Sequence, residues 1–121
     1  MKPNRILVSV MLSSALAGFA LNSQAAAATL QTTVTRVLTD TVFYGGCMAA
    51  LAISPTTELA GCAAGWVSFS CTGTFADKAL AFANFENAKM ALAMNKPVYV
   101  LFDDSKKHNG YCFARRVDVI K

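Results

Sequence analysis

The sequence predicts a β-rich α+β domain with five strands and one long helix between the third and fourth strands. Three observations carry this prediction. Five segments are rich in β-branched, aromatic or other apolar residues and are separated by turn-forming residues. One alanine-rich stretch without proline or glycine separates the third segment from the fourth. Four cysteines in a short chain indicate cross-links within a small domain.

The composition is that of one small folded domain. The chain has 121 residues, of which 55% are hydrophobic and 15% charged, so it is too apolar for a disordered segment and too short for two domains. The formal net charge of +4 is too small to indicate a nucleic-acid partner by itself. The single histidine, His108, excludes most histidine-based catalytic triads and multi-histidine metal sites.

Residues 1–25 have the pattern of a secretory signal peptide. Two basic residues precede an apolar run of sixteen residues, 6–21, and a small-x-small pattern then ends at Ala25. A membrane anchor is the alternative, but the run is shorter than the about 20 residues that span a bilayer. We expect cleavage after Ala25, with positions 27 and 28 as close alternatives. The product is a secreted or periplasmic domain over residues 26–121 with no membrane span.

Residues 29–44 predict one long first strand, because they are rich in threonine, valine and aromatic residues and lack proline and glycine. Apolar residues recur at every fourth position on one face of this strand: Leu30, Val34, Leu38 and Val42. Asp40 is a poor strand former, so we expect a bend or bulge near residues 39–41.

Two further strands follow a turn at Gly45 and Gly46. Residues 47–53 are uninterruptedly apolar and predict a strand buried on both sides. A loop at 54–61 leads to a third strand at 63–71. Trp66 lies in this apolar segment and is therefore expected in the core, with stacking on a sugar ring or a base as the alternative.

Residues 75–94 predict the helix, with Thr74 as its N-cap, Asp77 completing a capping box, and Asn95 and Pro97 ending it. At 100° per residue the apolar side chains form two separate arcs. The first arc contains Ala76, Leu80, Ala83, Met90 and Met94, and the second contains Phe75, Phe82, Phe85 and Leu92. One arc should cover the domain's own core. The other either meets a second subunit or is buried in the same domain.

The last two strands are predicted at 97–102 and 111–120, with a polar hairpin loop at 103–110 between them. The resulting order, β-β-β-α-β-β, is that of an OB-fold, a five-stranded barrel with one helix between strands three and four. A long, bent first strand suits this fold because it serves both halves of the barrel. An open antiparallel sheet with the helix packed on one face is the alternative.

Four cysteines in an exported chain predict two disulfides, for which three pairings are possible. The OB-fold order favours one of them. Cys47 and Cys71 would lie opposite each other across strands two and three. Cys62 and Cys112 would lie at the same end of the parallel strands three and five. A zinc site is disfavoured because the sequence has no C-x-x-C spacing.

Several short matches resemble the receptor-binding B subunits of bacterial AB toxins, such as those of subtilase cytotoxin and typhoid toxin. They are Asp40-Thr41, the cysteines 47 and 71, the helix start at 75–78 and the segment 96–100, within residues 30–102. The resemblance implies a ring of five subunits whose helices line a central pore, glycan binding on one face and a catalytic A subunit on the other. Two features depart from that family. No serine matches its early sugar-binding serine, and the pair Cys62 and Cys112 is additional.

The candidate ligand-binding residues lie near predicted turns. Loop 103–110 borders the ligand face of an OB-fold, and tyrosines beside turns can stack on sugar rings. Thr29 is the hydroxyl nearest to the position of the family's serine. The full set is Thr29, Tyr44, Lys106, Lys107, Asn109 and Tyr111.

No residue pattern predicts catalysis. Asp103 and Asp104 are adjacent and would point to opposite faces of a strand, and the four thiols are expected to be oxidised. The sequence therefore predicts an exported, non-catalytic subunit that binds host glycans, forms a homo-oligomer (a pentamer if it is toxin-like) and needs no cofactor, metal or nucleic acid. The alternative is a monomeric periplasmic OB-fold protein that binds a small ligand or inhibits a secreted enzyme.

Overall fold

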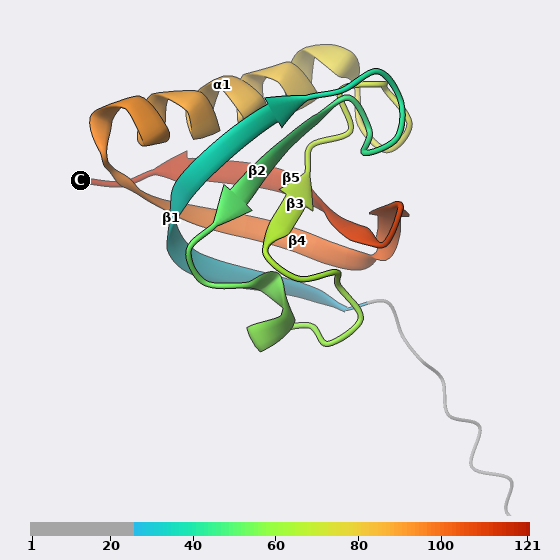
Figure 1. The fold of residues 1–121 in the computed structure, drawn as a ribbon, viewed down its shortest axis with the longest axis horizontal. Helices are drawn as coiled ribbons and strands as arrows, with labels where there is room; N and C mark the ends of the chain where they lie inside the picture. The colour runs from blue at the N-terminus through green and yellow to red at the C-terminus, as the bar shows by residue number, and fades with distance from the viewer. Residues whose placement is uncertain (1–25) are drawn as a thin grey trace, which may run out of the picture.

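A computed structural model describes residues 26–121, so the predicted signal peptide at 1–25 lies outside the described residues. The described part of the chain forms five strands and one long helix, arranged in space as Figure 1 shows. The elements are β1 (Ala27–Thr39), β2 (Cys47–Leu51), the short 3-10 helix η1 (Pro55–Thr57), β3 (Trp66–Ser68), α1 (Lys78–Met94), β4 (Pro97–His108) and β5 (Tyr111–Val119). No helix within residues 26–121 is long and apolar enough to cross a bilayer.

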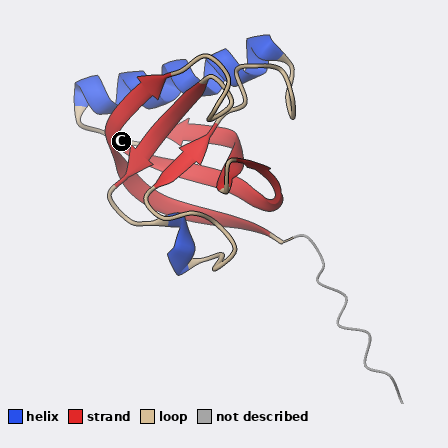
Figure 2. Ribbon diagram, turned by 45° about the vertical axis from the view of Figure 1, so that its right-hand side comes forward, coloured by secondary structure: helices blue, strands red, loops and turns tan. Residues whose placement is uncertain are grey.

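The five strands form one sheet that closes in a ring, in the order β1-β2-β3-β5-β4. β1 pairs with both β2 and β4, and β3 runs parallel to β5. Figure 2 shows α1 lying across one end of this sheet, with η1 at the opposite end. The prediction of five strands with a single long helix after the third is confirmed, and the open sheet does not form.

β1 serves both halves of the ring because it is long and irregular. Its first half pairs with β4 and its second half with β2, and the register shifts between Val34 and Arg36. The irregularity predicted near residues 39–41 is instead the end of the strand. The carboxylate of Asp40 accepts a hydrogen bond from the Thr41 amide at 2.7 Å, and this local contact favours a turn over further pairing.

The predicted apolar face of the first strand is only partly correct. Leu30 and Val34 are buried in the core, whereas Val42 lies in the loop after β1 and is 69% exposed. β2 is buried along its whole length, as predicted. β3 is much shorter than predicted, because the positive φ angles of Gly65 and Ser70 end regular pairing on either side of it.

α1 begins at Lys78 rather than near residue 75. Asp77 is the N-cap, since its carboxylate accepts from the Ala79 amide at 2.8 Å. The hydroxyl of Thr74, the predicted cap, instead contacts the hydroxyl of Thr72 at 2.9 Å. Asn95 ends the helix in a left-handed conformation, as a C-terminal residue before a strand often does.

The buried face of α1 consists mainly of small residues. Ala81, Phe85, Ala88 and Ala91 pack on the sheet. Alanines let the helix approach the strands closely, so only one large side chain is needed to fill the gap. Much of the first predicted arc faces outward, with Leu80, Met90 and Met94 65%, 49% and 58% exposed. The second arc is divided, because Phe85 is buried while Phe82 is exposed.

The β4–β5 hairpin is longer and tighter than predicted. β4 continues to His108, and the predicted loop at 103–110 reduces to a turn at Asn109 and Gly110. Both residues have positive φ, +52° and +86°, as the commonest two-residue hairpin turn requires. Lys106 and Lys107 therefore belong to the end of a strand.

Both predicted disulfides form. Cys47 is bonded to Cys71 and Cys62 to Cys112, with Cα–Cα distances of 5.6 and 5.3 Å. All four cysteines are buried. The first bond joins the start of β2 to the residues after β3. The second joins the segment before β3 to the start of β5.

Candidate functional site

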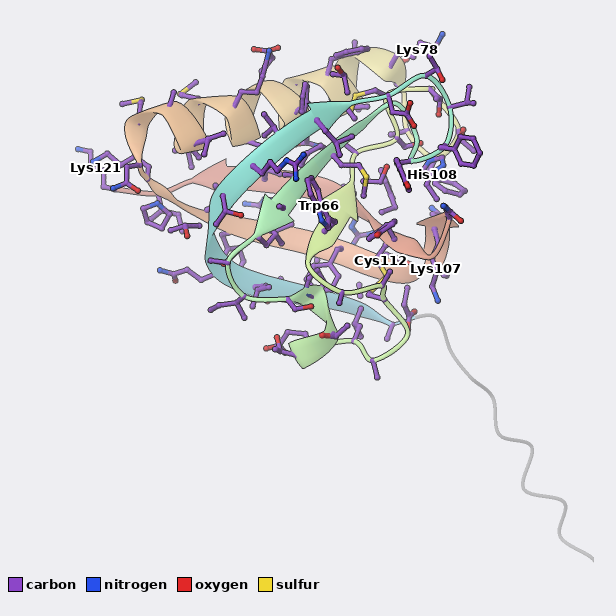
Figure 3. All side chains as sticks on the ribbon, viewed as in Figure 1. Trp66, Lys78, Lys107, His108, Cys112 and Lys121 are labelled. Carbon is purple, nitrogen blue, oxygen red and sulfur yellow. A yellow bond between two sulfur atoms is a disulfide. The ribbon has the colours of Figure 1, made fainter. Side chains whose placement is uncertain are left out.

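An aromatic pocket of about 160 Å³ lies on the outer face of the sheet, where four strands and one loop meet. The aromatic pocket is lined by Leu38, Tyr44, Met48, Trp66 and Tyr111. Successive residues of a strand point to opposite faces, so Trp66 faces outward while its neighbour Val67 is fully buried. Figure 3 places Trp66 over β2 and β3, on the side of the sheet that faces the viewer.

The structure brings together two of the predicted ligand-binding residues, Tyr44 and Tyr111. Their rings meet edge to face, with centroids 5.6 Å apart and an interplanar angle of 79°. Trp66 was expected in the core, but it is half-buried and forms a wall of the same pocket. The guanidinium of Arg36 lies 5.6 Å from the Trp66 ring centroid and adds positive charge beside the pocket.

Close packing behind Tyr44 fixes its backbone. The Ser68 hydroxyl donates to the Tyr44 carbonyl at 2.6 Å. The next residue, Gly45, is buried with a φ of +77°, and a Cβ there would lie 2.5 Å from Cδ2 of His108. A glycine is therefore required at this position both for its backbone angle and for its lack of a side chain.

His108 joins the hairpin to the segment before α1. Its Nε2 lies 2.9 Å from the Ser70 hydroxyl, which also accepts from the Phe75 amide at 3.0 Å. Its ring packs on the Phe75 ring with centroids 4.7 Å apart. Burial lowers the pKa of His108 below its ordinary value, so the neutral imidazole is favoured at this contact with Ser70. Apart from its being the single histidine of the chain, nothing in the sequence indicates this role for His108.

The other predicted ligand-binding residues lie outside the aromatic pocket. Lys107 donates to the carbonyl of Gly61 at 2.6 Å, and so holds the loop before β3. Asn109 forms the hairpin turn, and Lys106 is exposed on β4. The hydroxyl of Thr29 accepts from the Tyr99 hydroxyl at 2.9 Å, on the β1–β4 part of the sheet.

The two adjacent carboxylates have separate partners. Asp103 accepts from the amide and the hydroxyl of Ser105, and these hydrogen bonds, the hydroxyl foremost, lower its pKa. Asp104 accepts from the backbone amide of Ala26. Neither arrangement pairs the carboxylates for acid–base work. Within residues 26–121 no three cysteine, histidine or acidic side chains are grouped as metal ligands would be.

Comparison of the chain with protein-family models, curated proteins and solved structures found no match. The geometry of the aromatic pocket and of the exposed face of α1 therefore carries the functional proposal.

Proposed function

We propose that this chain is an exported, non-catalytic subunit with an OB-fold that recognises glycans and assembles into a ring, as the toxin B subunits that it resembles do. The observation that carries the proposal is the aromatic pocket. It places three aromatic side chains, those of Tyr44, Trp66 and Tyr111, around a hollow on the outer surface of the sheet.

The strand order supports the assignment of an OB-fold. Closure in the order β1-β2-β3-β5-β4, with a helix between β3 and β4, matches the order expected for that fold. OB-folds bind oligosaccharides and oligonucleotides on the face of strands two and three, between the β1–β2 and β4–β5 loops. Met48 and Trp66 belong to those strands, Tyr44 to the first loop, and Tyr111 follows the β4–β5 turn.

The size and chemistry of the pocket favour a sugar. Its volume of about 160 Å³ is below the about 300–1,000 Å³ typical of sites for larger ligands, and it suits a single ring. The apolar C–H face of a sugar ring can pack on aromatic faces while its hydroxyl groups remain in water. The formal net charge of +4 falls to +2 once Lys2 and Arg5 leave with the signal peptide, which disfavours nucleic acid.

The exposed apolar face of α1 supports assembly. Leu80, Met90 and Met94 are large apolar side chains on one side of the helix, and each is about half exposed or more. Contiguous apolar surface on a small protein commonly marks an interaction site. In the proposed ring, this face of each helix meets the neighbouring subunit.

A glycan array tests the binding function. Exported wild-type protein, Tyr111→Ala and Phe43→Ala are applied to the same array and their affinities for any bound glycan are compared. We expect Tyr111→Ala to lose at least tenfold in affinity, because it removes one wall of the pocket. Phe43→Ala is the matched control, since Phe43 is 70% exposed and adjacent to Tyr44 but does not line the pocket. Absence of glycan binding by the wild type would reject the proposal.

The mass in solution distinguishes this function from the alternative. Size-exclusion chromatography with light scattering should give about five times the mass of the monomer for a toxin-like ring. A monomer that binds a small ligand, or that inhibits a secreted enzyme, would support the second function instead.

A further inference from the structure

Ala26, the first residue after the expected cleavage point, is held by Asp104 where β1 begins. The backbone N–H of Ala26 donates to Oδ1 of Asp104 at 2.9 Å, and the Asp104 amide donates back to the Ala26 carbonyl at 3.1 Å. The next residue, Ala27, pairs with Asp103 in the β1–β4 ladder. A carboxylate oxygen therefore lies at hydrogen-bond distance from the nitrogen of the Ala25–Ala26 peptide bond.

We propose that a secretory endopeptidase cleaves the chain between Ala25 and Ala26, and that the ammonium group released on Ala26 forms an ion pair with Asp104. Water is the co-reactant. The C–N bond breaks, the water oxygen is added to the carbonyl carbon of Ala25, and the products are a carboxylate on Ala25 and an ammonium on Ala26. The donor atom stays in place, but it changes from a neutral amide to a cation. Hydrogen bonds between ionised groups are stronger than those between neutral ones.

The pairing of β1 distinguishes between cleavage points that the sequence leaves open. Cleavage after position 27 or 28 would remove residues that belong to β1. Ala28 pairs with Phe102 and packs against the core, so its loss would remove ladder contacts and buried apolar surface. Cleavage after Ala25 keeps the strand complete and leaves its first nitrogen beside Asp104.

Asp104 forms no ion pair with another side chain within residues 26–121. Among residues 26–121, the ion pairs join Lys89 to Glu86 and Arg116 to Asp118, and neither pair includes Asp104. The nearby ammonium of Lys107 is directed to the Gly61 carbonyl. Processing would therefore supply Asp104 with a cationic partner, and would fasten the free end of β1 to β4. This inference does not depend on glycan binding.

The test uses the full chain, exported from a bacterium, with its product identified by intact mass. We expect a product that begins at Ala26. A second version carries Gly-Ser inserted directly after Ala25, which keeps the Ala26 amide but moves the ammonium two residues away. Asp104→Asn is made in both versions, and Asp103→Asn is the matched control because its carboxylate bonds to Ser105 rather than to Ala26.

Urea unfolding then measures the folding equilibrium constant of each product. We expect Asp104→Asn to reduce this constant about two- to fivefold more in the native version than in the inserted one, as for a partly exposed ion pair. The extra loss should shrink in 1 M salt. Asp103→Asn should cost the same in both versions. A product that begins at residue 28 or 29, a retained signal peptide, or equal losses from Asp104→Asn in both versions would overturn the proposal.

Discussion

Gly45 is the residue on which the shape of the aromatic pocket depends most directly. It follows Tyr44, has a φ of +77°, and is packed so closely that a Cβ would lie 2.5 Å from His108 Cδ2 and 2.6 Å from the Ser68 hydroxyl oxygen. Ser68 also holds the Tyr44 carbonyl. A side chain at position 45 would therefore push against His108 and against Ser68, which holds the Tyr44 carbonyl.

Replacement of Gly45 tests this dependence. Gly65→Ala is the matched control, because Gly65 has a similar φ of +83° but no atom within 4 Å of the added Cβ. We expect Gly65→Ala to cost about 1–2 kcal/mol of unfolding free energy from its backbone angle alone. Gly45→Ala should cost about 1–3 kcal/mol more, from steric overlap, and should weaken ligand binding. Equal losses in urea unfolding would show that the contacts around Gly45 do not constrain it.

His108 should make the unfolding free energy decrease in mild acid. Burial holds its folded-state pKa below the ordinary value of 6.5, so the unfolded chain takes up the proton first as the pH falls. Its contribution to the unfolding free energy is therefore complete above about pH 6.5 and is lost as the pH falls through the lower folded-state pKa. His108→Gln should flatten the pH profile between pH 7.5 and 5, measured by urea unfolding. An unchanged slope in this variant would assign the acid sensitivity to other groups.

At the scale of elements, the sequence predicted the type and order of the strands and the helix better than their limits. Alternation and β-propensity identify a strand, but local hydrogen bonds decide where it stops. The Asp40 carboxylate ends β1 before Val42, and the left-handed Ser70 shortens β3. The Asn109-Gly110 pair is a strong sequence signal for a two-residue hairpin turn, and in the structure this turn takes the place of the loop predicted at 103–110.

The two arcs of α1 left open whether one apolar face would remain uncovered, and they did not identify the residues that are buried. The buried face consists of Ala81, Phe85, Ala88 and Ala91. Phe85 belongs to the second predicted arc, whereas the three alanines belong to neither arc. A prediction of the buried face from hydrophobicity favours large apolar side chains over alanine. Close packing of the helix on the sheet instead selects small side chains. The sequence therefore could not rank the faces without the strands against which α1 packs.

A charge on the exposed face of α1 tests whether subunits meet there. Met90 is 49% exposed, so Met90→Glu should leave the monomer folded, while a desolvated carboxylate would oppose a helix-mediated interface. If the proposed subunit ring forms through this face, Met90→Glu should give monomers in light scattering, with an unchanged helical signal in circular dichroism. Ala93→Glu, also exposed on α1 but outside the arc, is the control and should keep the wild-type mass. Dissociation by both variants, or by neither, would contradict assembly through this face.

At the scale of the whole molecule, closure of the sheet creates the aromatic pocket from residues distant in sequence. The prediction that residues beside turns bind ligand selected Tyr44 and Tyr111, which do meet. Trp66 was expected in the core because both faces of its strand are apolar in sequence, so alternation alone does not identify the outer face. The prediction also placed the lysines on the ligand face, whereas Lys107 holds the Gly61 carbonyl. Such a contact joins the end of β4 to a loop distant in sequence, and it has no signature in local sequence.

The closed sheet has the fewest backbone pairs at the contact between β3 and β5. These strands share one paired position, Ser68 with Phe113, whereas β2 and β3 pair at three consecutive positions. The bond between Cys62 and Cys112 spans the same contact, while the bond between Cys47 and Cys71 reinforces a hairpin that the ladder already holds. The two disulfides should therefore differ in what they contribute to closure.

Removal of each disulfide measures this difference. The cysteines are 50 and 24 residues apart, so loop entropy in the unfolded chain predicts about 4.1 kcal/mol for Cys62–Cys112 and about 3.4 kcal/mol for Cys47–Cys71. We expect the double variant Cys62→Ala/Cys112→Ala to lose more unfolding free energy than Cys47→Ala/Cys71→Ala. The difference should exceed the entropic difference of about 0.7 kcal/mol, because the first variant also weakens the β3–β5 contact. Amide exchange at Phe113 should accelerate more in that variant. Equal protection of the Phe113 amide from exchange in both variants would show that the single backbone pair between β3 and β5 is enough to keep the sheet closed.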